Sequence, residues 1–209
     1  MLTLFPLNLV VYPKEKLNLH VFEPRYRQLV NECLEQDTTF GVPAFLDNKI
    51  ADYGTEVKII AVEKQYEDGR MDIRTEGMRI FRLLDYENPL ADKLYAGGTV
   101  EFLEPVDEPA SAKLTTDVLN KLSKLYSLLE LKFDLAVSRV RTLSYEVAHK
   151  IGLSVEQEYE LLTIPTEAER QRYLLGHLER VIPIVADMEK TKDRIRMNGH
   201  FKTFDPLNF

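Results

Sequence analysis

The stretch "LHVFEPRYRQL", residues 19–29, gathers several groups that are able to do acid–base chemistry. A glutamate, two arginines and a tyrosine lie within residues 23–27. A general acid or base needs a partner group and a pocket that holds the substrate. The nearest histidine, His20, lies on a predicted strand, where a histidine is usually a packing or surface residue. The residue types alone therefore do not define a catalytic site.

A junction between a strand and a helix explains the same residues. Pro24 is expected in the first helical turn, where its missing N–H costs nothing, and Glu23 at the positive end of the helix dipole. The apolar spacing that follows predicts a helix with one face formed by Tyr26, Leu29, Val30, Cys33 and Leu34. The predicted structural motif is Phe22, Glu23, Pro24, Arg25 and Tyr26. Glu23→Ala is accordingly expected to lower stability before it affects any activity.

No catalytic, cofactor-binding or metal-binding residues are predicted in the rest of the chain. The sequence has no P-loop and no H-E-x-x-H, C-x-x-C or G-x-S-x-G motif. His149 and His177 could meet between helices, but nothing supplies the further ligands of a metal site. An enzyme is therefore left without a recognisable mechanism, and no cofactor is expected.

Composition excludes several other classes of protein. The chain has 209 residues, of which 27 are basic and 34 are acidic, so its formal charge is −7. Such an acidic balance disfavours binding to nucleic acid. No apolar run approaches the roughly 20 residues that span a bilayer, and the opening residues do not resemble a signal peptide. The single cysteine, Cys33, fits a cytoplasmic protein, and neither a membrane nor a nucleic acid is expected as a partner.

Residues 1–107 are predicted to form a β-rich lobe. The segments "TEVKIIAVEKQY" and "RMDIRTEGMRIFRLLDYE" are rich in β-branched and aromatic residues, and Asp68-Gly69 between them is a hairpin signal. Gly77 interrupts the alternation and is expected to mark a bulge or a close backbone approach. Short strands linked by hairpins imply a mostly antiparallel sheet that is closed or nearly closed.

Residues 108–197 are predicted to form a helical lobe, and residues 198–209 a C-terminal tail. Apolar stripes at helical spacing predict a bundle of about four helices, which makes the fold class α+β. Ser154 and Gln157 form a predicted capping box, and Pro183 is expected to kink or break the last helix. One of the predicted stripes consists of Ala136, Val140, Leu143, Val147 and Ile151.

Residues 2–30 resemble the opening of the Lon substrate-binding domain (the Lon N-terminal domain). The resemblance extends over nearly the whole chain, and it is specific in the first ninety residues and loose after them. The family pattern L-x-L-F-P-L, V-x-x-P, L-x-L-x-I-F-E-P-R-Y is matched by Leu4, Phe5, Pro6, Leu7, Val11, Pro13, Leu17, Leu19, Phe22, Glu23, Pro24, Arg25 and Tyr26. Lys14 departs from this pattern, since family members often have a glycine after the V-x-x-P proline. The resemblance implies a PUA-like β-barrel lobe followed by a helical bundle, together one LON domain. It also implies a stand-alone relative of the Lon N-domain and of the module in cereblon, without ATPase and Ser-Lys protease domains.

A non-catalytic module that binds a polypeptide or protein partner is the function that the resemblance implies. Such a partner could be an unfolded client or a separate protease or ATPase that uses this protein as an adaptor. The candidate binding residues are Tyr12 and Phe45 in the β lobe and Phe201, Phe204 and Phe209 in the tail. Core packing is the alternative explanation for Tyr12 and Phe45. The alternative functions are a module that binds a small ligand or RNA and an enzyme of unrecognised type, and the oligomeric state is not predicted.

Overall fold

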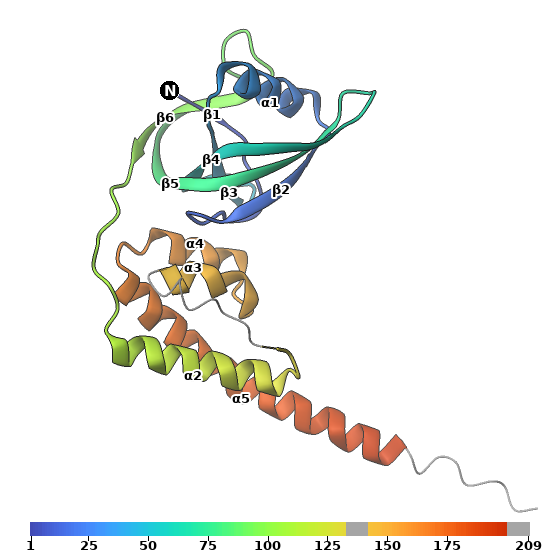
Figure 1. Cartoon of the computed structure of the whole chain (residues 1–209), viewed down its shortest axis with the longest axis vertical. Coiled ribbons are helices and arrows are strands. Elements are labelled where there is room, and N and C mark those ends of the chain that lie inside the picture. Colours follow the sequence, from blue (N-terminus) through green and yellow to red (C-terminus); the bar gives the residue numbers. More distant parts are fainter. Residues whose placement is uncertain (133–141, 200–209) are drawn as a thin grey trace, which may run out of the picture. The chain divides into compact units, whose positions relative to one another are not determined.

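The computed structural model describes residues 1–132 and 142–199, and these form an α+β fold (Figure 1). Their contacts divide the chain into two units, each of which is described by itself. The sheet unit consists of residues 1–107 and 145–166. The helical unit consists of the described parts of 108–144 and 167–209. None of the helices in these described residues is both long and apolar enough to cross a membrane.

The sheet unit contains the strands, the helices α1 and α4 and a short 3-10 helix. Its elements are β1 (Leu2–Leu4), β2 (Lys16–Val21), α1 (Pro24–Gln36), β3 (Phe40–Leu46), β4 (Lys49–Gln65), β5 (Met71–Glu87), β6 (Ala96–Phe102), the 3-10 helix η2 (Ala148–Lys150) and α4 (Val155–Thr163). The short helix α3 (Leu143–Val147) spans the boundary between the two units.

The strands form one mixed sheet in the order β2-β5-β4-β3-β1-β6. β1 lies parallel to β3, and the other pairings are antiparallel. β5 pairs with β2 through its first half and with β6 through its second half, where Phe81 lies opposite Phe102. The pairings therefore return to β5 and form the closed cycle β5-β4-β3-β1-β6. The predicted hairpin at Asp68-Gly69 is confirmed, since β4 leads into β5 and Gly69 has a φ of 83°.

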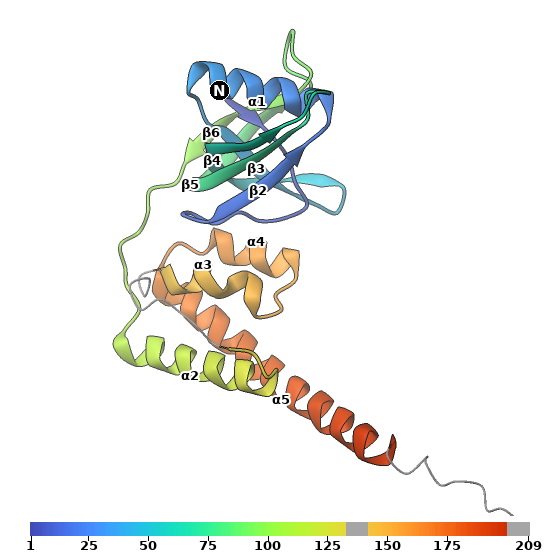
Figure 2. The same cartoon turned by 45° about the vertical axis from the view of Figure 1, so that its right-hand side comes forward.

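α1 packs its predicted face onto the sheet (Figures 1 and 2). Tyr26, Leu29, Val30 and Cys33 are buried, whereas Leu34, at the margin of the same face, is 41% exposed. The helix begins at Pro24, as the sequence predicts, and it ends at Asp37, whose left-handed backbone (φ 48°) stops it. The core beneath α1 contains Phe5, Val11, Val21, Phe40, Val42, Val57, Met71 and Ile73.

Gly77 is a point of close backbone approach, as expected. A Cβ atom at Gly77 would lie 2.1 Å from the carbonyl oxygen of Tyr12. The Gly77 carbonyl accepts a hydrogen bond from the Lys14 N–H (2.7 Å), and its N–H donates to the Glu15 carbonyl (2.8 Å). The loop before β2 is therefore held against the middle of β5 at a position where a side chain does not fit.

Residues 145–166 join the sheet unit, although the sequence analysis placed them in the helical lobe. The hydroxyl of Tyr12 donates a hydrogen bond to the Glu158 carbonyl (3.0 Å), and the ring of Tyr12 stacks on that of Tyr145 with centroids 4.8 Å apart. Tyr159 accepts a hydrogen bond from the Tyr53 N–H. The predicted capping box of Ser154 and Gln157 is confirmed and starts α4.

The helical unit is built from α2 (Ala112–Leu128) and α5 (Glu167–Gly199). A buried network supports it, in which Glu167 accepts hydrogen bonds from the Ser144 hydroxyl (2.6 Å) and from Arg170. α5 continues through Pro183, so a break of the helix at this residue is wrong, whereas the expected kink stays a prediction. A proline removes one backbone hydrogen bond, and the buried residue Ile182 beside it keeps this turn packed. Of the predicted stripe, Ala136 and Val140 lie outside the described residues, whereas Leu143, Val147 and Ile151 are buried.

Candidate functional site

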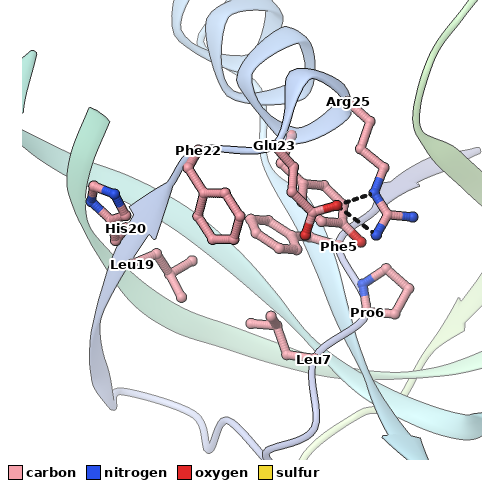
Figure 3. Close-up of a pocket in the computed structure, with 9 residues that line it drawn as sticks. Phe5, Pro6, Leu7, Leu19, His20, Phe22, Glu23 and Arg25 are labelled. Atoms are coloured by element: carbon pink, nitrogen blue, oxygen red, sulfur yellow. Dashed lines mark hydrogen bonds and ion pairs between the residues drawn. The ribbon is translucent and has the colours of Figure 1, made fainter. Parts of the chain in front are cut away.

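A small pocket lies beside the junction between β2 and α1 (Figure 3). Its volume is about 180 Å³. Three segments of the chain supply its walls: the residues after β1, the end of β2 and the first turn of α1. They contribute Phe5, Pro6, Leu7, Leu19, His20, Phe22, Glu23, Arg25 and Tyr26. The motif that the sequence analysis treated as structural therefore also lines a pocket.

The inner wall of the pocket is apolar and well ordered by packing. The rings of Phe5 and Tyr26 are stacked with centroids 3.7 Å apart, and both side chains are buried. Leu7 and Leu19 are partly buried and pack against the core of the sheet unit. Phe22 differs from them, because 58% of its surface is exposed. A large aromatic side chain thus stands in solvent beside an apolar wall.

Paired charges form the rim. Glu23 accepts hydrogen bonds from Arg25, with an Nη2 to Oε2 distance of 2.8 Å, as Figure 3 shows. The guanidinium of Arg25 lies 4.4 Å from the centroid of the Tyr26 ring. On the other side, His20 lies 2.6 Å from a carboxylate oxygen of Asp72. Hydrogen bonds from His20 and from Tyr66 lower the pKa of Asp72. Glu23 and Arg25 therefore neutralise each other at this part of the rim.

The pocket opens beside a strand edge. β2 is the terminal strand of the sheet order and pairs with β5 along one side. Within residues 1–132 and 142–199, no strand pairs with its other side. An unpaired edge carries backbone N–H and C=O groups that can pair with another extended chain. Apolar side chains and free backbone groups therefore lie next to each other.

A second, shallower hollow of about 580 Å³ lies where β4 and β5 separate. The pairing of these strands ends at Tyr53 and Arg82, and beyond that point their ends diverge. Phe45 (37% exposed) and Leu84 (56% exposed) belong to its lining. The full lining is Phe45, Asn48, Lys49, Ile50, Asp52, Leu83, Leu84, Asp85 and Tyr86.

The model of the ATP-dependent protease La (LON) substrate-binding domain matches residues 1–180 of this chain. The chain belongs to the LON substrate-binding domain family. The resemblance that the opening residues carry is thereby confirmed, and the relatives are of bacterial type.

Individual relatives of the LON family agree in sequence and in fold. Lon protease 2 of Syntrophobacter fumaroxidans is 28% identical over 93% of this chain, and the chain spans only 26% of that protein's length. The crystal structure of a Lon N-terminal domain protein from Xanthomonas campestris is similar with a TM-score of 0.65 and 28% identity, covering 84% of this chain and 96% of that one. The N-terminal domain of the Mycobacterium avium complex Lon protease shares the fold (TM-score 0.60, 14% identity; 85% of this chain and 97% of that one).

The candidate binding residues of this LON domain lie in different environments. Tyr12 is fully buried and hydrogen-bonded, which fits a core residue. Phe45 lines the second hollow. Phe201, Phe204 and Phe209 lie outside the described residues. Leu19 and Leu84 line the two hollows but are not among the predicted site residues, because both continue the strand pattern and nothing local in the sequence marks them as pocket walls.

The junction motif has both a structural and a lining role in this LON domain. Pro24 starts α1 and Tyr26 is buried, which fits the expected structural role. Glu23 occupies the N-cap position, but its side chain makes no capping hydrogen bond and pairs with Arg25 instead. Phe22 is too exposed to contribute much to the core.

Proposed function

We propose that this protein is a non-catalytic module that binds extended, apolar segments of polypeptide at the pocket beside β2. The family is that of the substrate-binding domain of a protease, which supports a protein ligand. The observation that carries the proposal is Phe22, a 58% exposed aromatic residue that lines this small pocket and directly follows β2, the strand with the unpaired edge.

The size of the pocket favours one side chain over a small-molecule ligand. Pockets for drug-sized ligands measure about 300–1,000 Å³, whereas this one measures about 180 Å³. A single leucine-like or aromatic side chain fits such a volume, and the backbone on either side of it can pair with the edge of β2. Side chains at alternate positions of the bound segment would then point toward the apolar wall.

The remaining features of the proposal follow from the family. We take the closed strand cycle as the PUA-like barrel lobe of a LON domain, and α2 and α5 as part of its helical lobe. Binding without ATPase or protease chemistry suits an adaptor that presents clients to a separate proteolytic system. The setting that we propose is the cytoplasm, where a single buried thiol such as Cys33 stays reduced.

The test compares two alanine substitutions at equally exposed apolar residues. Phe22 lines the pocket and Leu94 does not, and each is 58% exposed. Binding of a fluorescently labelled, reduced and carboxymethylated unfolded protein is measured by anisotropy. We expect Phe22→Ala to weaken binding about 5- to 30-fold, as for a buried aromatic anchor, and Leu94→Ala to leave it unchanged.

A third variant assigns the binding to one of the two hollows. Leu84→Ala removes a 56% exposed side chain from the second hollow. If Leu84→Ala weakens binding and Phe22→Ala does not, the site is misplaced. If the wild-type protein does not bind the unfolded chain at all, the proposed function is wrong.

A further inference from the structure

β4 and β5 part from each other at one corner of the closed strand cycle. Their pairing ends at Tyr53 and Arg82, but β4 already begins at Lys49 and β5 continues to Glu87. Beyond the last pair, the end of β4 pairs with β3 on its other side and the end of β5 pairs with β6. Each end therefore presents a backbone edge toward the second hollow, and no strand of the described residues pairs with it there.

Side-chain oxygens accept hydrogen bonds from two backbone N–H groups at this corner. The Tyr86 N–H donates to the carboxylate of Asp85 (2.9 Å), and the Tyr53 N–H donates to the hydroxyl of Tyr159 (3.2 Å). An extended chain offers backbone carbonyls to such donors at the regular spacing of a strand. The corner therefore has backbone groups with which a further strand can pair, as the edge of a sheet does.

The lining of this hollow is apolar and carries an excess of acidic groups. Leu84 is 56% exposed and Phe45 is 37% exposed. Asp52 and Asp85 bring two carboxylates to the lining, against the single ammonium group of Lys49. Complementary charge guides the choice of partner at an interface. Apolar side chains with basic neighbours are therefore the chemistry that this surface fits.

We propose that the second hollow is a further binding site, which takes an extended segment of a separate protein in which apolar and basic residues alternate. The segment pairs with the free edge of β5, which is recognition by β-strand addition. Side chains of a strand point alternately to its two faces. The apolar side chains of the segment therefore enter the hollow against Leu84 and Phe45, and its basic side chains stay at the rim beside Asp52 and Asp85.

The shape of the hollow favours such a segment. The hollow is shallow and follows β5 from Leu83 to Tyr86, a length of about 10 Å that matches about four residues of an extended chain. β2 of a second copy also has a free edge but does not suit the hollow, because Leu17, Leu19 and Val21 pack in the core of their own copy. The partner is accordingly a separate protein.

Fluorescence anisotropy of short labelled peptides on the full chain measures the binding. One peptide alternates leucine and lysine, and a second alternates leucine and glutamate. We expect the first to bind and the second to bind at least about tenfold more weakly, because its charges oppose those of the hollow. A third peptide keeps the leucine–lysine sequence but carries N-methyl groups on alternate backbone nitrogens. It should also bind at least about tenfold more weakly, because it cannot pair with a strand edge.

Four exposed residues supply the variants of the protein. Leu84→Ala should weaken binding of the leucine–lysine peptide about 5- to 30-fold, as for an apolar anchor, whereas Leu94→Ala, at a similarly exposed leucine outside the hollow, should leave it unchanged. Asp52→Asn should weaken binding and Lys49→Gln should strengthen it, each about two- to fivefold, as for exposed charges. Matching thermal melts show that the fold is kept.

Several results would overturn the proposal. Absence of binding of the leucine–lysine peptide excludes the site, and equal binding of its N-methylated form shows attraction by charge alone. Loss of binding on Phe22→Ala but not on Leu84→Ala places the peptide in the pocket beside β2. Tighter binding to a chain that ends at Gly199 makes residues 200–209 the occupant of the hollow. A dimer that the peptide dissociates in sedimentation velocity makes a second copy the occupant.

Discussion

Tyr26 and Glu23 belong to the same five-residue motif but contribute differently to stability. Tyr26 is 6% exposed and stacks on Phe5, whereas the Glu23 and Arg25 side chains of the neighbouring ion pair are 39% and 45% exposed. Truncation of a buried aromatic ring costs about 3–5 kcal/mol, and an exposed ion pair contributes about 0–1 kcal/mol. We therefore expect Tyr26→Ala to destabilise the protein several times more than Glu23→Ala, as measured by urea unfolding. Equal losses would mean that the ion pair has a structural role that its exposure does not suggest.

His149 lies between the carboxylates of Glu15 and Glu158. Its Nδ1 lies 2.7 Å from Glu158 and its Nε2 lies 3.2 Å from Glu15, so that one imidazole links α4 to the loop before β2. Burial by itself would lower the pKa of His149. The hydrogen bonds and charges of Glu15 and Glu158 outweigh this effect and raise the pKa to about 9. His149 is therefore a cation at neutral pH.

This shift of the His149 pKa makes stability depend on pH. Because folding raises the pKa from 6.5 to about 9, protonated His149 stabilises the fold fully below pH 6.5. The stabilisation is lost as the pH rises through 9. With a side chain that is 34% exposed, we expect a loss of about 1–2 kcal/mol after allowance for solvent screening. Urea titrations across this pH range should show the decrease in wild type and a flatter profile in His149→Gln. Parallel profiles would contradict this assignment.

At the scale of the elements, replacing each of two glycines by alanine is expected to change the stability of the protein in opposite directions. Gly77→Ala places a methyl group 2.1 Å from the Tyr12 carbonyl oxygen and must separate β5 from the loop before β2. We expect a destabilisation of about 2–3 kcal/mol from this overpacking. Gly176 lies inside α5 with open space around it, so Gly176→Ala should stabilise the protein by about 0.5–1 kcal/mol through helix propensity. Differential scanning calorimetry should show a lower melting temperature for Gly77→Ala and a higher one for Gly176→Ala. An unchanged melting temperature for Gly77→Ala would contradict the close approach of the two backbones.

Local signals allowed many elements to be predicted from the sequence. The Asp68-Gly69 turn, the start of α1 at Pro24 and the capping box of Ser154 each depend on residues within a few positions of one another. Pro183 does not end α5, because the effect of a proline on a helix also depends on the packing of adjacent turns, and that packing comes from other elements. The pocket could not be predicted, because its three walls come from segments that meet only in the folded sheet.

At the scale of the whole molecule, the division of the chain was the least predictable feature. The change from strand to helix periodicity near residue 107 is visible in the sequence. It does not reveal that residues 145–166 return to the sheet unit. That return depends on contacts such as the one between Tyr12 and Glu158, which are 146 positions apart. Periodicity reports which face of an element is buried and leaves open which element covers it.

The return of residues 145–166 predicts how truncated chains behave. A fragment of residues 1–107 lacks three groups that contact the rest of the sheet unit. These are the Tyr145 ring that stacks on Tyr12, the Glu158 carbonyl that accepts a hydrogen bond from the Tyr12 hydroxyl, and the His149 cation beside Glu15. The fragment would expose the buried ring of Tyr12 and remove the Glu158 carbonyl from the Tyr12 hydroxyl. We therefore expect residues 1–107 to melt at a much lower temperature than the full chain, or without a cooperative transition.

A fragment of residues 1–166 is the matched control, because it contains the whole sheet unit. We expect it to keep dispersed amide signals in NMR spectra and a cooperative melt of the sheet unit, whereas residues 1–107 lose both. Equal stability of the two fragments would show that the contacts of Tyr12 contribute little. The sheet and α1 would then hold the pocket without residues 145–166, and a binding test on the shorter fragment would be sufficient to locate the site.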